Sequence, residues 1–411
     1  MRIAYLNPSG ELGGAELSML DLMASIGGAQ LGWEMGLIVS ADGPLVARAR
    51  QLGVRTTVTP FPVVLSRLGD SRGWRNDSRL RRLATRTGLL SAAPAALSYS
   101  LRLRKELVAF APDVVHSNGF KMHVLGASAC KGRTPLVWHV RDFASSRPVM
   151  ARLLPWCSGR CARAVAISEA VARDLSSIAP QLKIETVYDG LDLDEFSPFG
   201  SCVDLDRLSE LPPAPPHTVR VGLVATFAWW KGHATFLRAL SLLPQALPIR
   251  GYVIGGGLYQ TSGSQHSMPE LRALAAELGI ADRVAFTGFI SQPSAAIRAL
   301  DIVIHASTEA EPFGRVIVEA MACGRPVITS GTGGASELVN DGSNALCHCA
   351  GDPESLARAI RRLVTEPELR RHLVQAGLAT ARARFDRKRL AAQMAACYSE
   401  IVEARHACSR A

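Results

Sequence analysis

Two series of β-strand and helix patterns, one in each half of the chain, limit the fold more than any other feature of the sequence. Each series alternates short runs of aliphatic or β-branched residues with helical patterns. The strand-like runs lie at residues 2–7, 33–40, 113–118, 135–140, 163–168 and 184–190, and again at 219–226, 250–257, 283–289, 301–307 and 325–330. Strands that alternate with helices form parallel, doubly wound sheets. The sequence therefore predicts an α/β protein with two such sheets.

A proline-rich segment separates the two series. Residues 209–217 hold four prolines in nine positions, which is typical of a joint between domains. With 411 residues, the chain is long enough for two domains that each bury a core. We expect an N-terminal domain at residues 1–212 and a second domain at 213–385. Ligands of such domains bind at the carboxyl ends of the strands, so we also expect a cleft between the domains.

Composition excludes several classes of protein. Apolar residues make up 48% of the chain and charged residues 20%, as in globular and not in disordered proteins. The N-terminus reads as a first strand and not as a signal peptide, and no apolar run is long enough to span a membrane. The nine cysteines include no CxxC pair, and the spacing around Cys347 and Cys349 does not match common zinc sites. We therefore expect a cytoplasmic protein without a metal.

The net charge of +10 is concentrated in residues 66–105. Ten Arg or Lys residues lie there against Asp70 and Asp77, and they flank an uncharged stretch at 87–101. Basic flanks around an apolar stretch favour binding to an anionic membrane surface. A solvated helix pair with an apolar inner face explains the pattern equally well. Nucleic acid is a weaker candidate because the segment holds only two aromatic residues, Trp74 and Tyr99.

Residues 307–326, STEAEPFGRVIVEAMACGRP, contain the main candidate site. Pro312 near the start and Gly324 near the end predict a helix, and its apolar residues on nearly every side predict that it is buried. Glu319 lies in the middle of this helix. A buried carboxylate needs a partner, which is either an arginine or helix end elsewhere, or the diol of a nucleotide ribose.

A second carboxylate, Glu311, lies eight residues before Glu319, at the predicted helix N-terminus. The N–H groups of Phe313, Gly314 and Arg315 would be unpaired there and would form an anion site. A ribose acceptor, a phosphate site and a further carboxylate on one element predict a nucleotide-sugar site.

Other strand ends carry residues suited to phosphate. Gly14 belongs to a glycine-rich loop before a helix, and Gly255 follows a strand in the second half. Lys231 stands at a strand-to-helix turn, where it suits a diphosphate as a point charge. His139 follows the run PLVW, and a histidine there is as often a packed residue as a functional one.

The pattern from Glu311 to Glu319, followed by AMACGRPVI, resembles the E-x7-E signature of the family 4 retaining glycosyltransferases. The segments GGAE, VAISEAVARDL, TVYDGLDLDEFSP, KGH and GDPESLARAI resemble further parts of that family in the expected order. The resemblance covers most of the chain. It implies the GT-B fold, with two Rossmann-like doubly wound domains facing a cleft and a final helix, residues 386–411, that packs back on the N-terminal domain.

The resemblance also implies roles for individual residues. Glu311, His139 and Lys231 would be catalytic, with Glu311 on a hydroxyl of the transferred sugar and His139 facing that sugar. The donor would be bound by Glu319 at the ribose, by Phe289 and Ile290 beside the base, and by Lys231, Gly14, Phe313, Gly314, Arg315 and Gly255 at or near the diphosphate. Transfer would proceed with retention, without a cofactor and commonly without a metal.

One position departs from the family pattern. Thr226 stands five residues before Lys231, where the family usually carries an arginine. The second charge for the diphosphate would then come from another residue, such as Arg315 or Arg141. This departure keeps open a catalytically silent subunit that binds nucleotide sugars without turnover.

The sequence thus predicts a retaining glycosyltransferase that uses a nucleotide-sugar donor and a saccharide or lipid-linked saccharide acceptor. We expect it to work at the inner face of the membrane, in the synthesis of cell-envelope or exopolysaccharide glycans. A GT-B epimerase, which needs no acceptor, and the silent subunit are the alternatives. A nicotinamide dehydrogenase is disfavoured because the first strand is not followed by G-x-G-x-x-G. A glycosidase is disfavoured because its two carboxylates flank one bond.

Overall fold

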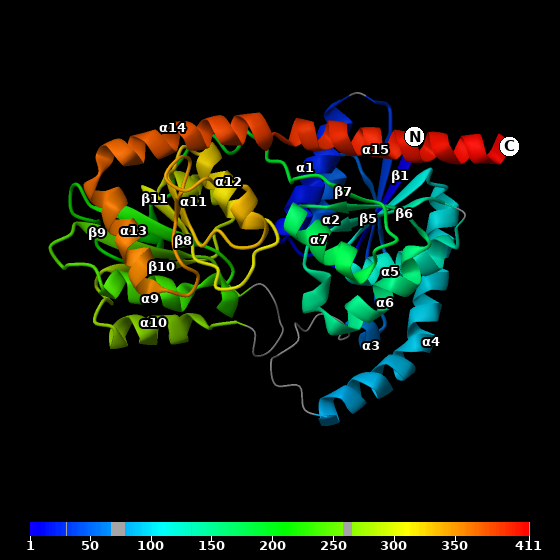
Figure 1. Ribbon diagram of the computed structural model, residues 1–411, viewed down its shortest axis with the longest axis horizontal. Coiled ribbons are helices and arrows are strands. Elements are labelled where there is room, and N and C mark those ends of the chain that lie inside the picture. The colour runs from blue at the N-terminus through cyan, green and yellow to red at the C-terminus, as the bar shows by residue number, and fades with distance from the viewer. Residues whose placement is uncertain (30, 67–78, 133, 258–264, 411) are drawn as a thin grey trace. The chain divides into compact units, whose positions relative to one another are not determined.

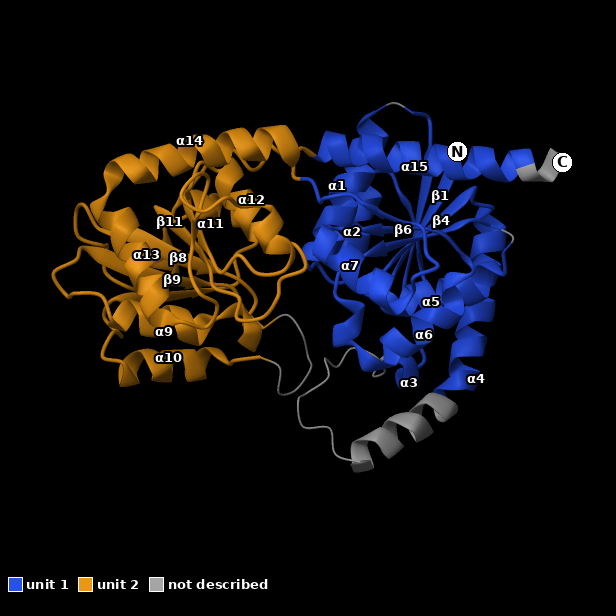
Figure 2. Cartoon of the chain, in the orientation of Figure 1, with its two compact units in different colours: residues 1–190, 387–411 blue, residues 191–386 orange. Residues whose placement is uncertain are grey.

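The chain folds into two compact units (Figure 2). A computed structural model describes residues 1–29, 31–66, 79–132, 134–257 and 265–410, with the backbone alone described at 66, 79–91 and 408–410. Unit 1 comprises residues 1–190 and 387–411, and unit 2 comprises residues 191–386.

Unit 1 contains a parallel sheet of seven strands in the order β3-β2-β1-β4-β5-β6-β7. The strands are β1 (Arg2–Asn7), β2 (Glu34–Val39), β3 (Arg55–Val58), β4 (Val114–Asn118), β5 (Leu136–Val140), β6 (Cys161–Ala166) and β7 (Ile184–Thr186). The central strands are buried on both faces, which explains their continuous apolar sequences. The strand order reverses between β1 and β4, and ligands of doubly wound sheets bind at such a point.

Helices cover both faces of this sheet (Figure 1). They are α1 (Gly14–Gly28), α2 (Pro44–Gln51), α3 (Val63–Ser66), α4 (Arg79–Phe110), α5 (Phe120–Cys130), α6 (Pro148–Ser158), α7 (Glu169–Ile178) and α15 (Arg387–Arg410), with a short 3-10 turn, η1 (Ala144–Ser146). The final helix, α15, packs against α1. Its residues Leu390, Met394, Tyr398 and Ile401 recur at helical spacing and belong to the core of unit 1.

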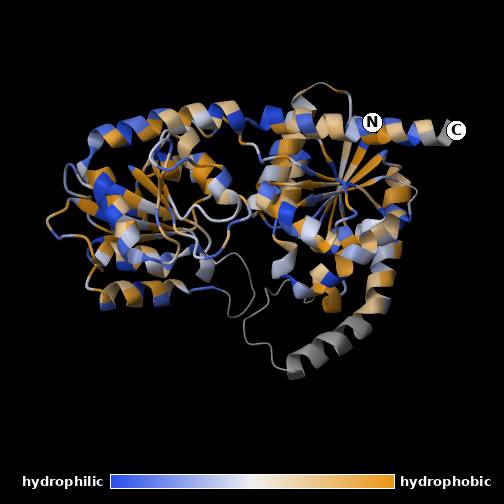
Figure 3. Cartoon of the chain, viewed as in Figure 1, coloured by the Kyte–Doolittle hydropathy of each residue, from blue (hydrophilic) through white to orange (hydrophobic). Residues whose placement is uncertain are grey.

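Unit 2 contains a parallel sheet of six strands in the order β10-β9-β8-β11-β12-β13. These strands are β8 (Val219–Val224), β9 (Ile249–Ile254), β10 (Val284–Gly288), β11 (Ile302–His305), β12 (Val327–Thr329) and β13 (Leu346–Cys347). The strands of both sheets are rich in apolar residues (Figure 3). The predicted fold class, two α/β units with parallel doubly wound sheets, is confirmed.

The helices of unit 2 alternate with its strands along the chain, with two exceptions. The helices are α8 (Leu205–Leu208), α9 (His233–Ser241), α10 (Met268–Glu277), α11 (Pro293–Arg298), α12 (Arg315–Ala322), α13 (Pro353–Thr365) and α14 (Pro367–Arg384), with 3-10 turns η2 (Trp229–Lys231) and η3 (Gly334–Glu337). The exceptions are that α8 precedes the first strand and that α14 follows α13 directly. Side chains of α9, α10 and α13 form one apolar core with the sheet.

The division between the units differs from the expected one at residue 213, since unit 2 begins at Leu191. Contacts to unit 2 explain the difference. The Arg298 guanidinium donates hydrogen bonds to the carbonyls of Glu195, Ser197 and Ser201. The segment before the prolines is thus held by unit 2 through side chains that a composition pattern does not reveal.

The predicted basic segment is described only in part. Residues 67–78 lie outside the described residues, and 79–91 are described as helix without side-chain surroundings. In the rest of α4, Leu97, Leu101 and Val108 are exposed close to Arg104 and Lys105. No described helix combines the length and the apolar character that crossing a membrane requires.

Candidate functional site

The carboxyl ends of the unit 2 strands gather most of the predicted site residues. Lys231 follows β8, Gly255 follows β9, Phe289 follows β10 and Glu311 follows β11. Because these strands are parallel neighbours, their ends lie along one edge of the sheet. Backbone bonds also connect the loops, since the Gly255 N–H donates to the Gly288 carbonyl at 3.0 Å.

Lys231 and Glu311 form an ion pair at this edge. The Nζ of Lys231 lies 3.0 Å from Oε1 and 2.7 Å from Oε2 of Glu311. The two side chains are 23% and 12% exposed, so a ligand can reach them. Burial raises the pKa of Glu311, but Lys231 and a hydrogen bond from His305 outweigh it and hold the pKa well below its usual range. Glu311 is therefore ionised at neutral pH.

Two further side chains contact the same carboxylate. The Ser307 hydroxyl donates to Oε2 of Glu311 at 2.8 Å, and Nε2 of His305 lies 3.3 Å from it. On the other side of the imidazole, Nδ1 lies 3.0 Å from Oγ1 of Thr329. These three residues were not identified from the sequence. They lie near the ends of two strand-like runs, and this position is the sequence feature that could have marked them as site residues.

Two glycines allow the loops to close around Glu311. Gly232 has φ 76°, and a Cβ there would lie 1.9 Å from the Ala306 carbonyl oxygen. Gly333 has φ 66°, and a Cβ there would lie 2.6 Å from the carbonyl oxygen of Glu311. Side chains rarely adopt such φ values. Glycine at both positions lets the loop after β8 reach the end of β11 and the loop after β12 reach Glu311.

The helix that carries Glu319 begins later than predicted. We expected it to start at Pro312, but α12 starts at Arg315. Gly314, the N-cap residue, has φ 97°, which is left-handed and interrupts a helix. Before it, the Glu311 backbone bonds to Thr332 and Gly334 instead. Glu319 therefore lies about one turn from the helix start, and not about two turns as a start near Pro312 would imply.

Glu319 has a partner on its own helix. Its side chain is buried, and Nε of Arg315 donates to Oε1 of Glu319 at 2.7 Å. The structure thus contains the arginine partner that a buried carboxylate requires. A ribose diol would share this carboxylate with Arg315.

The remaining unit 2 candidates differ in accessibility. Phe289 is 74% exposed and Ile290 is half-buried beside it, whereas Phe313 is buried. Gly255 has φ 143°, and the close approach of the Ala225 carbonyl leaves no room for a side chain. Gly255 is therefore required by the fold whether or not it also contacts a ligand.

In unit 1, Gly14 is exposed at the first position of α1. No described atom lies within 4 Å of the place where a Cβ would be. Glu16 fixes the loop before α1, since its carboxylate accepts hydrogen bonds from the Gly13 N–H at 3.1 Å and from the Asn7 side-chain amide at 3.2 Å. The N-terminus of α1 is thus open in front of Gly14.

His139 is buried in a polar network of unit 1. Its Nδ1 lies 3.2 Å from both Nη2 of Arg141 and Nε2 of His116. A guanidinium only donates, so Nδ1 accepts and the proton of His139 is on Nε2. Burial, followed by the charge of Arg141, lowers its pKa well below the usual value. His139 is neutral, and its Nε2 is buried without a hydrogen-bond partner among the described residues.

Both arginines that could supply the charge missing at Thr226 are already ion-paired. Arg141 binds Asp189 with Nη1 at 2.8 Å from Oδ1, and Arg315 binds Glu319. Thr226 itself is half-buried. If either arginine supplied the second charge for the diphosphate, the phosphate would share its guanidinium with the carboxylate partner.

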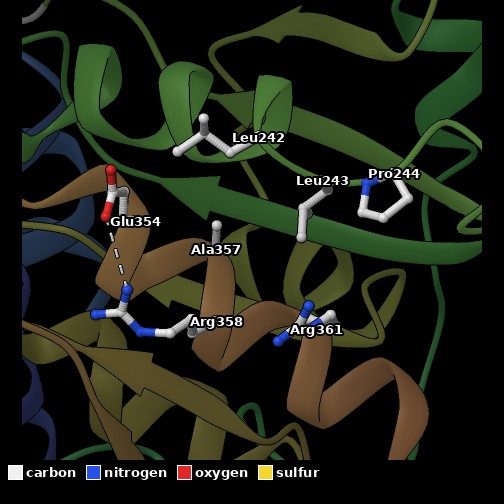
Figure 4. Close-up of a pocket in the computed structure, with 7 residues that line it drawn as sticks. All are labelled: Leu242, Leu243, Pro244, Glu354, Ala357, Arg358 and Arg361. Carbon is white, nitrogen blue, oxygen red and sulfur yellow. Dashed lines mark ion pairs between the residues drawn. The ribbon is translucent and has the colours of Figure 1, made fainter.

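A surface groove of about 250 Å³ lies elsewhere on unit 2 (Figure 4). It is lined by Leu242, Leu243, Pro244, Glu354, Ala357, Arg358 and Arg361. Arg358 and Glu354 are 3.9 Å apart and well exposed, and such pairs contribute little to stability or specificity. None of the predicted site residues lines this groove.

Family models match both halves of the chain. The model described as Glycosyl transferases group 1 matches residues 213–380, and the model described as Glycosyltransferase Family 4 matches residues 85–195. Together they cover the larger part of the sequence.

Two sequence relatives and one solved structure illustrate the similarity. The chain is 30% identical over 197 residues to the lipopolysaccharide core biosynthesis glycosyltransferase LpsE of Rhizobium meliloti, covering 48% of this chain and 54% of LpsE. It is 32% identical over 250 residues to a D-inositol 3-phosphate glycosyltransferase of Thermobispora bispora, covering 59% of this chain and 57% of that relative. The matches therefore span about half the length of these relatives.

The solved structure is Alr3699/HepE of Anabaena in complex with UDP-glucose. It is 26% identical, with a TM-score of 0.77 over 97% of this chain and 100% of that one. Family models on both halves and structural similarity over nearly the whole chain agree: the chain has the GT-B fold and is similar to the family 4 glycosyltransferases.

Proposed function

We propose that this protein transfers a sugar with retention from a nucleotide-sugar donor to a saccharide or lipid-linked saccharide acceptor. The pair of Lys231 and Glu311 at the carboxyl edge of the unit 2 sheet is the main support. It places a cation and an ionised carboxylate where ligands of doubly wound sheets bind. Similarity to HepE, whose structure holds UDP-glucose, supports a nucleotide-sugar donor.

In this proposal the donor binds along the edge of the unit 2 sheet. Lys231 neutralises the charge that develops on the departing diphosphate, which is the main electrostatic need of the reaction. Glu311 accepts a hydrogen bond from a hydroxyl of the transferred sugar. The other proposed donor contacts are Glu319 at the ribose, Phe289 and Ile290 at the base, and Gly14, Phe313, Gly314, Arg315 and Gly255 near the diphosphate, while His139 contacts the transferred sugar.

The bond changes are simple. The bond between the anomeric carbon and the diphosphate oxygen breaks, and the acceptor oxygen forms a new bond to that carbon on the same face. The acceptor hydroxyl passes its proton to the oxygen of the departing diphosphate. Lys231 offsets part of the negative charge that develops on the leaving diphosphate.

The acceptor and setting are proposed from the relatives. LpsE is named for lipopolysaccharide core biosynthesis, which fits an envelope or exopolysaccharide glycan as the product. An acceptor attached to a lipid would be met at the inner face of the membrane. The exposed apolar residues Leu97 and Leu101 of α4, next to basic residues, support a peripheral contact with anionic lipid.

Thr226 supports the second candidate, a subunit that binds nucleotide sugars without turnover. Both candidate replacements for the family arginine are ion-paired. An epimerase is distinguished by its product, since it changes the donor sugar in the absence of any acceptor.

Thermal unfolding with nucleotides tests the proposal. UDP, GDP, ADP and dTDP, each with its sugar nucleotides, are added to wild type, Lys231→Ala, Glu319→Ala and the exposed control Glu354→Ala. A bound ligand stabilises the fold by about 2.7 kcal/mol at a hundredfold excess over Kd. We expect nucleotides of one base to raise the Tm of wild type and of the control Glu354→Ala. The same nucleotides should raise the Tm of Lys231→Ala and Glu319→Ala much less. Absence of a shift with every nucleotide would contradict the proposed donor.

A further inference from the structure

Three side chains of the described residues contact the Glu311 carboxylate. Lys231 supplies the charge, and Ser307 and His305 supply further contacts to Oε2. Lys231 contacts both oxygens of the carboxylate, whereas the other two contact Oε2 only. Among the described residues, Lys231 is therefore the side chain on which Oε1 of Glu311 depends.

The hydrogen bonds around His305 show that Nε2 carries a proton. The ionised Oε2 of Glu311 can only accept, and the Ser307 hydroxyl already gives its own proton to that oxygen, so Nε2 of His305 is the donor toward both. The Nε2 proton points to Oε2 of Glu311 at 3.3 Å and to the Ser307 hydroxyl at 3.2 Å. On the other side of the ring, Oγ1 of Thr329 lies 3.0 Å from Nδ1 and accepts from the Gly331 N–H at 3.1 Å.

This arrangement creates a conflict when a diphosphate binds. In the proposed function Lys231 serves the diphosphate, yet its Nζ is engaged by both oxygens of Glu311. When Lys231 turns to the phosphate, Glu311 loses its main countercharge while its side chain is only 12% exposed. A carboxylate that loses its partner inside a protein is strongly destabilised unless other donors hold it.

We propose that His305 is a positioning residue that holds Glu311 in place while Lys231 engages the diphosphate of the donor. His305 is buried at the end of β11 and fixed from behind by Thr329 on β12, so its ring cannot follow Lys231. The Glu311 carboxylate then keeps its orientation toward the sugar. This inference rests on the proposed function and adds a residue to its site.

The consequence is a coupling between His305 and diphosphate affinity. Without the imidazole N–H, the carboxylate depends more strongly on Lys231 and competes better with the phosphate for it. His305→Leu removes the donor, whereas His305→Gln places an amide N–H near the position of Nε2. A buried histidine of unit 1, changed by His123→Leu, is the matched control.

Isothermal titration with UDP, GDP and ADP tests the coupling without requiring transfer. For the nucleotide that wild type binds, we expect His305→Leu to bind about tenfold more weakly, the scale of one hydrogen bond to a charged group. We expect His305→Gln and His123→Leu to bind within about threefold of wild type. Equal affinity of His305→Leu and wild type would overturn the inference while leaving the proposed function intact.

A double-mutant cycle separates positioning from a general structural effect. In a Glu311→Gln background the side chain is uncharged, so His305→Leu should no longer change nucleotide affinity. The same tenfold loss in both backgrounds would show that His305 acts on the fold and not on Glu311. If wild type binds none of these three nucleotides and also does not bind dTDP, the proposed function fails, and this inference fails with it.

Turnover supplies a second readout. Because Glu311 contacts the sugar in the proposed function, we expect His305→Leu to lower kcat as well as raise KM, and His305→Gln to recover most of kcat. A change in KM alone, with kcat at the wild-type level, would contradict a role in orienting Glu311.

Discussion

Glu311 is the residue on which most of the account depends. Its carboxylate is ionised because Lys231 and His305 outweigh burial. Sequence reasoning identified Glu311 and Lys231 separately, since each follows a strand-like run. It did not predict their ion pair, because the two are 80 residues apart and only the parallel order of β8 and β11 brings them together.

The ion pair makes a prediction about stability and pH. The folded-state pKa of Glu311 is depressed, so the unfolded state binds more protons as pH falls, and the stabilisation present at neutral pH is lost through the acid range. We expect the unfolding free energy of wild type to fall more steeply below about pH 4.5 than that of Glu311→Gln. Urea unfolding across this range measures the difference.

The unfolding free energies of wild type and Glu311→Gln should therefore diverge progressively as the pH falls. The exposed Glu354→Gln serves as control and should follow wild type. Parallel curves for wild type and Glu311→Gln would show that the pair does not stabilise the ionised carboxylate.

Substitutions at two glycines distinguish an effect on ligand binding from an effect on the stability of the fold. Gly14→Ala adds a methyl group that meets no described atom, so we expect unchanged or slightly higher thermal stability with weaker nucleotide-sugar binding. Gly232→Ala forces a Cβ to 1.9 Å from a carbonyl oxygen at φ 76°, so we expect a clear loss of stability.

Thermal unfolding with and without the donor measures both effects of these glycine substitutions. Unchanged donor affinity in a fully folded Gly14→Ala variant would remove Gly14 from the proposed site.

At the scale of elements, the predicted strands and helices were mostly recognisable from local pattern. The start of α12 was not, because it depends on the left-handed Gly314 and on backbone bonds from Glu311 to residues 332 and 334. A proline is compatible with a helix start but does not impose one. The position of Glu319 within its helix could therefore not be derived from spacing alone.

Helix α4 makes a prediction about membranes. Leu97 and Leu101 are exposed one turn apart beside Arg104 and Lys105. We expect the protein to sediment with vesicles that contain anionic lipid and to be released as salt rises. Leu97→Asp with Leu101→Asp should reduce binding, whereas Leu242→Asp, an exposed leucine of unit 2, should not. Sedimentation that is equal for neutral vesicles would contradict the role of the basic residues.

At the scale of the whole molecule, alternation of strands and helices predicted two parallel sheets, and each unit has one. The boundary near residue 190 was not predictable, because it follows from the bonds of Arg298 and from Asp206, which accepts from Arg250 and Tyr252. The packing of α15 on unit 1 rests on Leu390, Met394 and Tyr398, whose spacing shows an apolar stripe but not the surface that it covers.

The central claim is transfer of a sugar with retention, and transfer to water tests it before the acceptor is identified. A nucleotide sugar that stabilises the protein is incubated with wild type and with Lys231→Ala, and proton NMR follows the first anomer of the released sugar. The account predicts release of the nucleoside diphosphate together with the anomer that the donor carried, and strongly reduced release by Lys231→Ala. Release of the opposite anomer, or undiminished release by Lys231→Ala, would contradict it.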